Sequence, residues 1–194
     1  RAVITYDLNN GVGTTPTQSI YSGSALTLPA GTGLSKSGYT FGGWSLTETG
    51  TALNSPYSPS ASRTLYAVWT GNQYTITYNA NGGTGTQTAG SYTTGAAATS
   101  LPATSTFTRT GYSFGGWATT SGSTTPVTTY STSATATFYA IWTRGTYNVR
   151  FLANGGVGTM ETQTSSATAN LSANTFTYAD RTFTGWNTSA DGTG

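Results

Sequence analysis

Apolar and polar residues alternate along several short stretches of this chain. Ile4, Tyr6 and Leu8 fall on one side of an extended segment and polar residues lie between them. The stretch 74–80 repeats the pattern. Alternation with a period of two predicts β-strands that are buried on one face only.

A short glycine-rich phrase follows each of these stretches: "NNGVG" at 9–13, "NGGTG" at 81–85 and "NGGVG" at 154–158. Asn and Gly tolerate the positive φ angles that primed hairpin turns require. We therefore expect a tight hairpin here, leading into a second strand rich in Thr and Ser. The next strand signals are the aromatic phrases below and the closing stretches "LYAVW" and "FYAIW".

The strand and its turn occur three times in the chain. Tyr6, Tyr78 and Phe151 correspond, which gives a repeat period of about 72 residues. "TLYAVWT" at 64–70 matches "TFYAIWT" at 137–143, and the third copy reaches Gly194 without this phrase. The repeats predict three units: residues 1–71, residues 72–144, and residues 145–194 without a closing strand.

A second copied phrase is aromatic: "YTFGGWS" at 39–45, "YSFGGWA" at 112–118 and "RTFTGWN" at 181–187. In a regular strand its Phe and Trp would point to opposite faces, whereas a bulge at a glycine would change this. The second glycine is kept in all copies, so we interpret it as a bulge or a close backbone approach. The predicted structural anchors of the cores are Phe41, Gly43, Trp44, Trp69, Phe114, Gly116, Trp117, Trp142, Phe183, Gly185 and Trp186.

The composition favours the same fold class. Charged residues make up 6% of the chain and aromatic residues 13%, while threonine, serine and glycine are abundant. Good helix formers are scarce, and the aromatic content is too high for a disordered tract. We expect a mostly β protein with little helix, built as a tandem array of small modules.

The residue inventory restricts the chemistry. There is no cysteine and no histidine, and residues 72–144 contain no acidic residue and no lysine. A function shared by the copies therefore cannot use acid–base, thiol or metal chemistry. We expect no enzyme activity, no catalytic or metal-binding residue and no cofactor.

Charge and hydropathy restrict the partners. The net charge of +2 is spread along the chain without a basic cluster, so nucleic acid is not an expected partner. No apolar run approaches the length of a membrane span. We expect no signal peptide at the N-terminus and no membrane insertion in these residues.

The combined pattern of strand, "NGG", long gap, "GYTFGGW", loop and "LYAVWT" closely resembles the Listeria–Bacteroides repeat family, to which the internalin B-repeat belongs. The resemblance implies a β-grasp-like module found in tandem in secreted or surface-attached bacterial proteins, where it serves as stalk, spacer or adhesion unit. The third copy departs from the pattern, because it lacks the Gly-Tyr pair of Gly38–Tyr39 and Gly111–Tyr112.

Three hypotheses follow. The leading one is a non-enzymatic, extracellular structural protein, cell-surface or secreted, that forms part of a stalk or fibre. The second is self-association, in which a neighbouring molecule adds a strand to the incomplete third unit and builds a filament. The alternative is an adhesin module that binds host glycan or protein through aromatic side chains of its less regular segments: Tyr21, Tyr57, Tyr92 and Tyr130.

Overall fold

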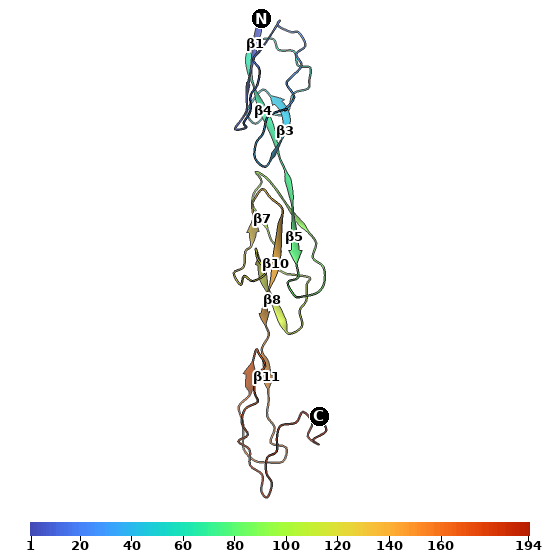
Figure 1. Cartoon of the computed structure of the whole chain (residues 1–194), viewed down its shortest axis with the longest axis vertical. Coiled ribbons are helices and arrows are strands. Elements are labelled where there is room, and N and C mark those ends of the chain that lie inside the picture. Colours follow the sequence, from blue (N-terminus) through green and yellow to red (C-terminus); the bar gives the residue numbers. More distant parts are fainter.

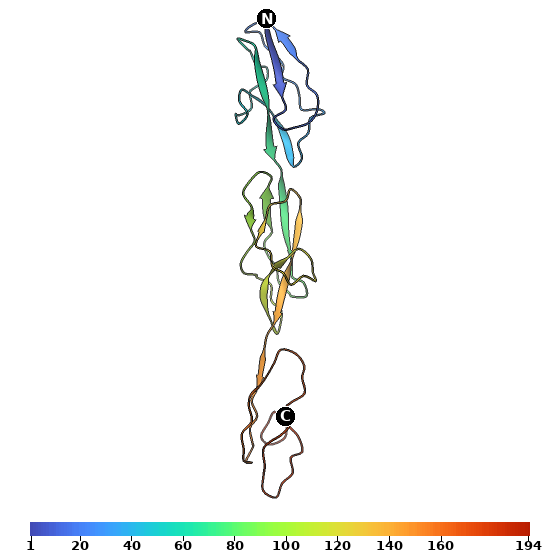
Figure 2. The same ribbon diagram turned by 90° about the vertical axis from the view of Figure 1, so that its left-hand side faces the viewer.

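The structure is a computed structural model that describes all residues from 1 to 194. It contains strands and turns but no helix, and so none that could cross a membrane. The three units follow one another along a single long axis, with the N-terminus at one end (Figures 1 and 2). The expected mostly β fold in tandem modules is confirmed.

The first unit is built on a four-stranded mixed sheet with the order β2-β1-β4-β3. The central pair β1–β4 is parallel, and both outer pairs are antiparallel. The closing strand β4 therefore lies between the first strand of the unit and the aromatic phrase. The four strands are β1 (Ala2–Asp7), β2 (Gln18–Ile20), β3 (Tyr39–Ser45) and β4 (Arg63–Gly71).

The second unit repeats this sheet with the order β6-β5-β10-β8, and it adds a two-stranded ribbon β7–β9. Its strands are β5 (Gln73–Asn79), β6 (Gly90–Thr93), β7 (Thr99–Ser100), β8 (Tyr112–Ala118), β9 (Thr129–Tyr130) and β10 (Ala136–Arg144). The third unit has only the antiparallel pair β11 (Tyr147–Val149) and β12 (Gln163–Ser165).

Each complete unit has its own hydrophobic core on one face of its sheet. In the first unit Ile4 and Leu65 are fully buried, and Trp44 is 1% exposed. The Trp44 indole N–H donates to the carbonyl oxygen of Pro29 at 2.8 Å, so its polar atom is satisfied inside the core. Burying one such ring stabilises a unit by roughly 4–6 kcal/mol at most.

The aromatic phrase reaches this core through a β-bulge, as expected. Phe41 pairs with Trp69 and Gly43 pairs with Val68, which leaves Gly42 as an extra residue. The extra residue turns Phe41 and Trp44 toward the same side, where their ring centroids lie 5.3 Å apart. Gly43 has a φ of 123°, and a Cβ there would lie 3.0 Å from the Cβ of Ala52. The retained glycine is thus a bulge residue in a left-handed conformation.

The prediction of a tight hairpin after the first strand is wrong. Asn9 and Asn10 do take positive φ angles, of 49° and 64°. The chain then runs to a bridge between Val12 and Ser35, and β2 begins only at Gln18.

The physical reason is the tryptophan of the closing strand. The Trp69 indole N–H donates to the Leu8 carbonyl at 2.8 Å, and a Cβ at Gly11 would lie 2.4 Å from the indole Cζ2. The turn therefore wraps the chain over Trp69 instead of returning it directly beside β1.

In the third unit the phrase 181–187 does not form a strand. No strand equivalent to β4 or β10 is present to pair with it. Trp186 still stacks on Phe151, with ring centroids 4.5 Å apart, and donates to the Ser172 carbonyl at 3.0 Å. Phe183 is 46% exposed, so it does not anchor a buried core in this unit.

Because of the bulge, substitution by alanine should destabilise the first unit much more at one glycine of the phrase than at its neighbour. Gly43→Ala should destabilise the first unit by about 1–3 kcal/mol, because an L-residue is strained at this φ. Gly42→Ala is the matched control and should cost less than about 1 kcal/mol, since Gly42 has an ordinary φ and Thr184 occupies its position in the third unit. Urea unfolding of both variants measures the costs, and equal costs would contradict this interpretation of the bulge.

Tyr6 makes the first unit sensitive to alkali. Burial raises the pKa of Tyr6 from 10.0 to about 12 in the folded chain. The unfolded chain therefore loses this proton first, and stability should fall as the pH rises from 10 towards 12. Thermal unfolding of Tyr6→Phe at a series of pH values should show a shallower alkaline decline than wild type. Tyr21→Phe, at a position 65% exposed, is the control and should keep the wild-type slope.

Candidate functional site

The predicted anchors take three kinds of position in the structure. Trp44 and Trp117 are each 1% exposed and lie at the centres of the two complete cores. Phe183 and Gly185 of the third unit are exposed. Trp186 is half-buried against Phe151 in the third unit. The remaining anchors are half-buried in the two complete units: Phe41, Gly43, Trp69, Phe114, Gly116 and Trp142.

Each unit has a four-residue turn that stacks a cation on a tyrosine, and we call this turn the stacked corner. In the first unit the Lys36 ammonium lies 4.9 Å from the Tyr39 ring centroid. In the second unit the Arg109 guanidinium lies 4.1 Å from the Tyr112 ring centroid. The backbone N–H of each tyrosine donates to the carbonyl oxygen of its cation, at 2.9 and 3.0 Å. Both distances suit a cation–π interaction.

The stacked corner explains the Gly-Tyr pair of the sequence. Gly38 and Gly111 stand at the third position of the turn with φ angles of 78° and 77°. A positive φ at this position is what a type II turn requires, and glycine adopts it without strain.

The third unit keeps the stacked corner with its two partners exchanged. Tyr178 stands where the other units have the cation, and Arg181 stands where they have the tyrosine. The Arg181 guanidinium still lies 5.1 Å from the Tyr178 ring centroid. Asp180 replaces the glycine and takes a φ of 60°. The lost Gly-Tyr pair has therefore not removed the turn.

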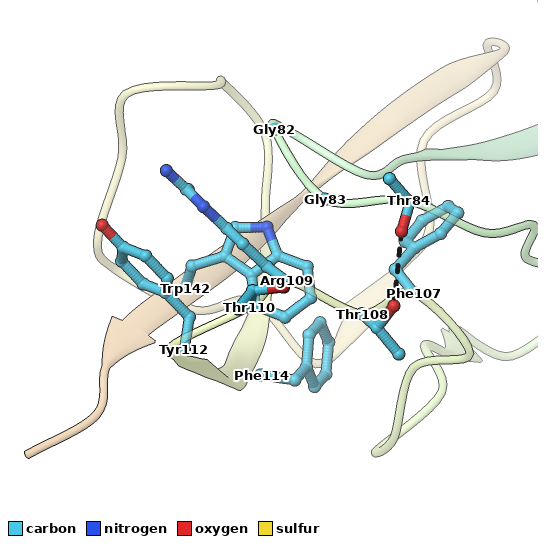
Figure 3. A pocket seen from close by; sticks show the side chains of 10 residues that line it. All are labelled: Gly82, Gly83, Thr84, Phe107, Thr108, Arg109, Thr110, Tyr112, Phe114 and Trp142. Carbon is cyan, nitrogen blue, oxygen red and sulfur yellow. Dashed lines mark hydrogen bonds between the residues drawn. The ribbon is translucent and has the colours of Figure 1, made fainter. Parts of the chain in front are cut away.

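A groove of about 540 Å³ opens beside the stacked corner of the second unit (Figure 3). The turn 82–84 forms one side and the segment 107–112 forms the other, with Trp142 and Phe114 between them. The backbones of Thr84 and Thr108 bond to each other at 2.8 and 2.9 Å and hold the two sides together. The groove is thus a formed concavity with both aromatic and polar walls.

A second arginine lies at this groove's tyrosine. Nε and Nη2 of Arg144 donate to the Tyr112 hydroxyl at 3.2 and 3.0 Å. These hydrogen bonds and the positive charges of Arg144 and Arg109 lower the pKa of the Tyr112 phenol. Residues 72–144 contain no carboxylate, so neither guanidinium has an acidic partner within its unit.

The stacked corners also form the joints between units. One residue, Asn72, separates β4 from β5. Its backbone N–H donates to the Gly38 carbonyl at 2.9 Å, and its carbonyl accepts from the Thr94 N–H at 3.0 Å. The Thr40 hydroxyl donates to the Asn72 side chain at 2.6 Å. A Cβ at Gly71 would lie 2.1 Å from the Thr94 carbonyl oxygen, so the two units touch closely here.

The second joint, between the second and third units, has fewer hydrogen bonds than the first. The Gly145 N–H donates to the Gly111 carbonyl at 2.8 Å, as Asn72 does at the first joint. Glycine at this position offers no side chain for a bond like that from Thr40. The Tyr147 side chain is 57% exposed, yet its hydroxyl lies at the stacked corner, where a Cβ at Gly111 would be 2.4 Å from it. The second joint therefore lacks a side-chain bond like that of Asn72 but still contacts the stacked corner.

The repeat pattern does not predict the stacked corner or the joints, and the cations look dispersed along the chain. A cation three residues before Tyr39 and Tyr112 is the one sequence signal of the corner. The four tyrosines expected to bind a ligand in the adhesin hypothesis do not form a common exposed surface. Tyr92 is 6% exposed and packs on Tyr130, with ring centroids 5.9 Å apart. Only the side chain of Tyr21 is largely exposed among those four.

Comparison of the sequence with known proteins assigns the chain to a family. The chain is 29% identical, over 188 residues, to a protein of Evansella cellulosilytica whose name describes it as a Gly-rich membrane protein. The match covers 84% of this chain but only 20% of that relative. No solved structure matches. The Listeria-Bacteroides repeat domain matches residues 3–68, 74–141 and 147–194, so the chain belongs to the Listeria-Bacteroides repeat family of surface proteins.

Proposed function

We propose that this chain is a non-enzymatic segment of an extracellular bacterial stalk or fibre, at the cell surface or secreted. The observation that carries the proposal is the first joint. There a strand of one unit continues into the first strand of the next across the single residue Asn72, which is hydrogen-bonded to both units.

A joint of this kind suits a spacer. A one-residue connection leaves little freedom for the units to swing, and the backbone bonds on either side of it oppose bending. Because each joint is bonded through the backbone carbonyl of the corner glycine, Gly38 or Gly111, the arrangement can be copied with each repeat. Serial copies then add length without any binding site being required.

The joint can be tested by adding one methyl group. Gly71→Ala should displace the Thr94 backbone, because the new Cβ would lie 2.1 Å from its carbonyl oxygen. We expect both units to stay folded while the angle between them becomes variable. Small-angle X-ray scattering of the full chain should show a broader distribution of dimensions for Gly71→Ala than for wild type.

Gly122→Ala is the control for the scattering experiment, since nothing lies within 4 Å of a Cβ at that position. It should scatter like wild type. A wild-type chain that is already as variable as Gly71→Ala would refute the semi-rigid stalk. Circular dichroism on the same samples verifies that the sheets of the two complete units persist.

The third unit supports a second proposal, assembly by strand addition. Its segment 181–187 carries the aromatic phrase but has no strand partner, and Phe183 is 46% exposed. In the complete units this phrase pairs with the closing strand, β4 or β10. A strand of that type would pair with the phrase, and where another molecule supplies it, the pairing would build a filament.

Solution mass across a dilution series tests strand addition. We expect the chain to form oligomers whose mass rises with concentration. Appending "TFYAIWT" after Gly194 should complete the unit from within and leave a monomer. The same seven residues in scrambled order are the control and should leave the oligomers unchanged. A wild-type chain that stays monomeric at every concentration would refute filament formation by this route.

A further inference from the structure

We propose that the groove beside the stacked corner of the second unit binds an acidic saccharide, a chain of sugars that carries carboxylate groups such as those of uronic acids. This site goes beyond the stalk proposed above and does not depend on it. Its components are the guanidinium of Arg109 and the rings of Tyr112 and Trp142. Arg144 does not line the groove but adds a second positive charge at the Tyr112 hydroxyl.

Uncompensated charge is the first argument. Unit 2 has two arginines and no carboxylate, and both guanidiniums lie at the one tyrosine, 4.1 and 5.6 Å from its ring centroid. Arg144 uses two of its donors on the Tyr112 hydroxyl. Arg109 is held by stacking, which leaves its planar fork of N–H donors for a ligand. That fork matches a carboxylate with two parallel hydrogen bonds.

Comparison with the first unit is the second argument, because the corresponding cation is already hydrogen-bonded there. The Lys36 ammonium donates to the carbonyl of Asn9 at 3.1 Å, so one of its donors is already used. The first unit has Asn10 where the second has Gly82. A Cβ at Gly82 would lie 3.5 Å from the Arg109 guanidinium carbon, so glycine leaves that side of the cation uncovered.

Preorganisation is the third argument. The Trp142 indole N–H donates to the Ala80 carbonyl at 2.8 Å, and a Cβ at Gly83 would lie 2.6 Å from its Cζ2. The ring is therefore fixed in place. Stacking on Tyr112 limits the rotamers of Arg109 in the same way. A ligand that enters the groove thus loses little affinity to ordering these side chains.

The walls favour a saccharide over an acidic peptide. A peptide that binds by strand addition needs free backbone N–H and C=O groups at the site. Thr84 and Thr108 have already bonded theirs to each other. The hydroxyls of these two residues are also bonded to each other, at 3.3 Å (Figure 3). What remains is an aromatic face, the Thr110 hydroxyl and a guanidinium, which suit the apolar face, a hydroxyl and the carboxylate of an acidic sugar. The groove volume of about 540 Å³ is within the range of small-ligand sites.

The test titrates oligogalacturonate into the full chain and follows backbone amides by NMR. We expect shifts confined to residues 82–84 and 107–112. Arg109→Gln should weaken binding about tenfold or more, because a charge-assisted hydrogen-bonded pair is lost. Lys36→Gln is the matched control from the first unit and should bind as wild type does.

A second variant separates local folding from ligand contact. Gly82→Asn introduces the residue of the first unit, where Asn10 tolerates a φ of 64°. It should keep the amide spectrum of the second unit while covering Arg109, and so weaken binding by a similar factor. An unchanged affinity in both Arg109→Gln and Gly82→Asn would overturn the proposal.

Three further probes decide the class of ligand. Neutral dextran should not bind, since it has no carboxylate for Arg109. Equal or tighter binding of polyglutamate would overturn the saccharide in favour of an acidic peptide. Binding of dextran sulfate without oligogalacturonate would overturn the carboxylate in favour of sulfate. Shifts distributed over all three units would show nonspecific attraction to net charge and would also overturn the site.

Discussion

The structure depends on one interaction, the placement of the closing strand between the first strand and the aromatic phrase. In the complete units this strand pairs in parallel with β1 or β5 on one side and antiparallel with β3 or β8 on the other. The third unit shows the same chain without it. Its first strand, β11, pairs with β12 alone, its aromatic phrase forms no strand, and Phe183 is exposed. Side-chain pattern alone does not make a strand when no backbone partner is available.

Two glycine conformations connect this sheet to the features on its surface. The bulge at Gly43 and Gly116 turns the phenylalanine and tryptophan of each phrase toward one core. The positive φ at Gly38 and Gly111 forms the turn that stacks a cation on a tyrosine. Both devices lie in the same short phrase, so the segment that anchors the core also forms the stacked corner and the joint to the next unit. Core, corner and joint are therefore copied together.

The units share a design but differ at their corners. The first has a lysine bonded to the turn beside it, the second has two arginines without a carboxylate in the unit, and the third has exchanged its tyrosine and arginine. The joints differ as well, because Asn72 ties two units together with its side chain while Gly145 cannot. A repeat protein can thus keep one fold and vary its surface from unit to unit.

The sequence by itself determined the repeats, the mostly β class and the family resemblance, because each depends on local pattern: alternation, spacing of tryptophans, and copied phrases. For the retained glycine it left two alternatives, a bulge or a close backbone approach, and the strand register decided for the bulge. Tertiary structure alone decided the rest. Trp69 diverts the chain that was expected to form a tight hairpin, and Tyr92 is buried although it was assigned to the less regular segments. Arg109 and Arg144 are far apart in sequence, and only the pairing of β8 with β10 brings both to Tyr112. Long-range pairing of strands decides which side chains meet, and no local pattern records it.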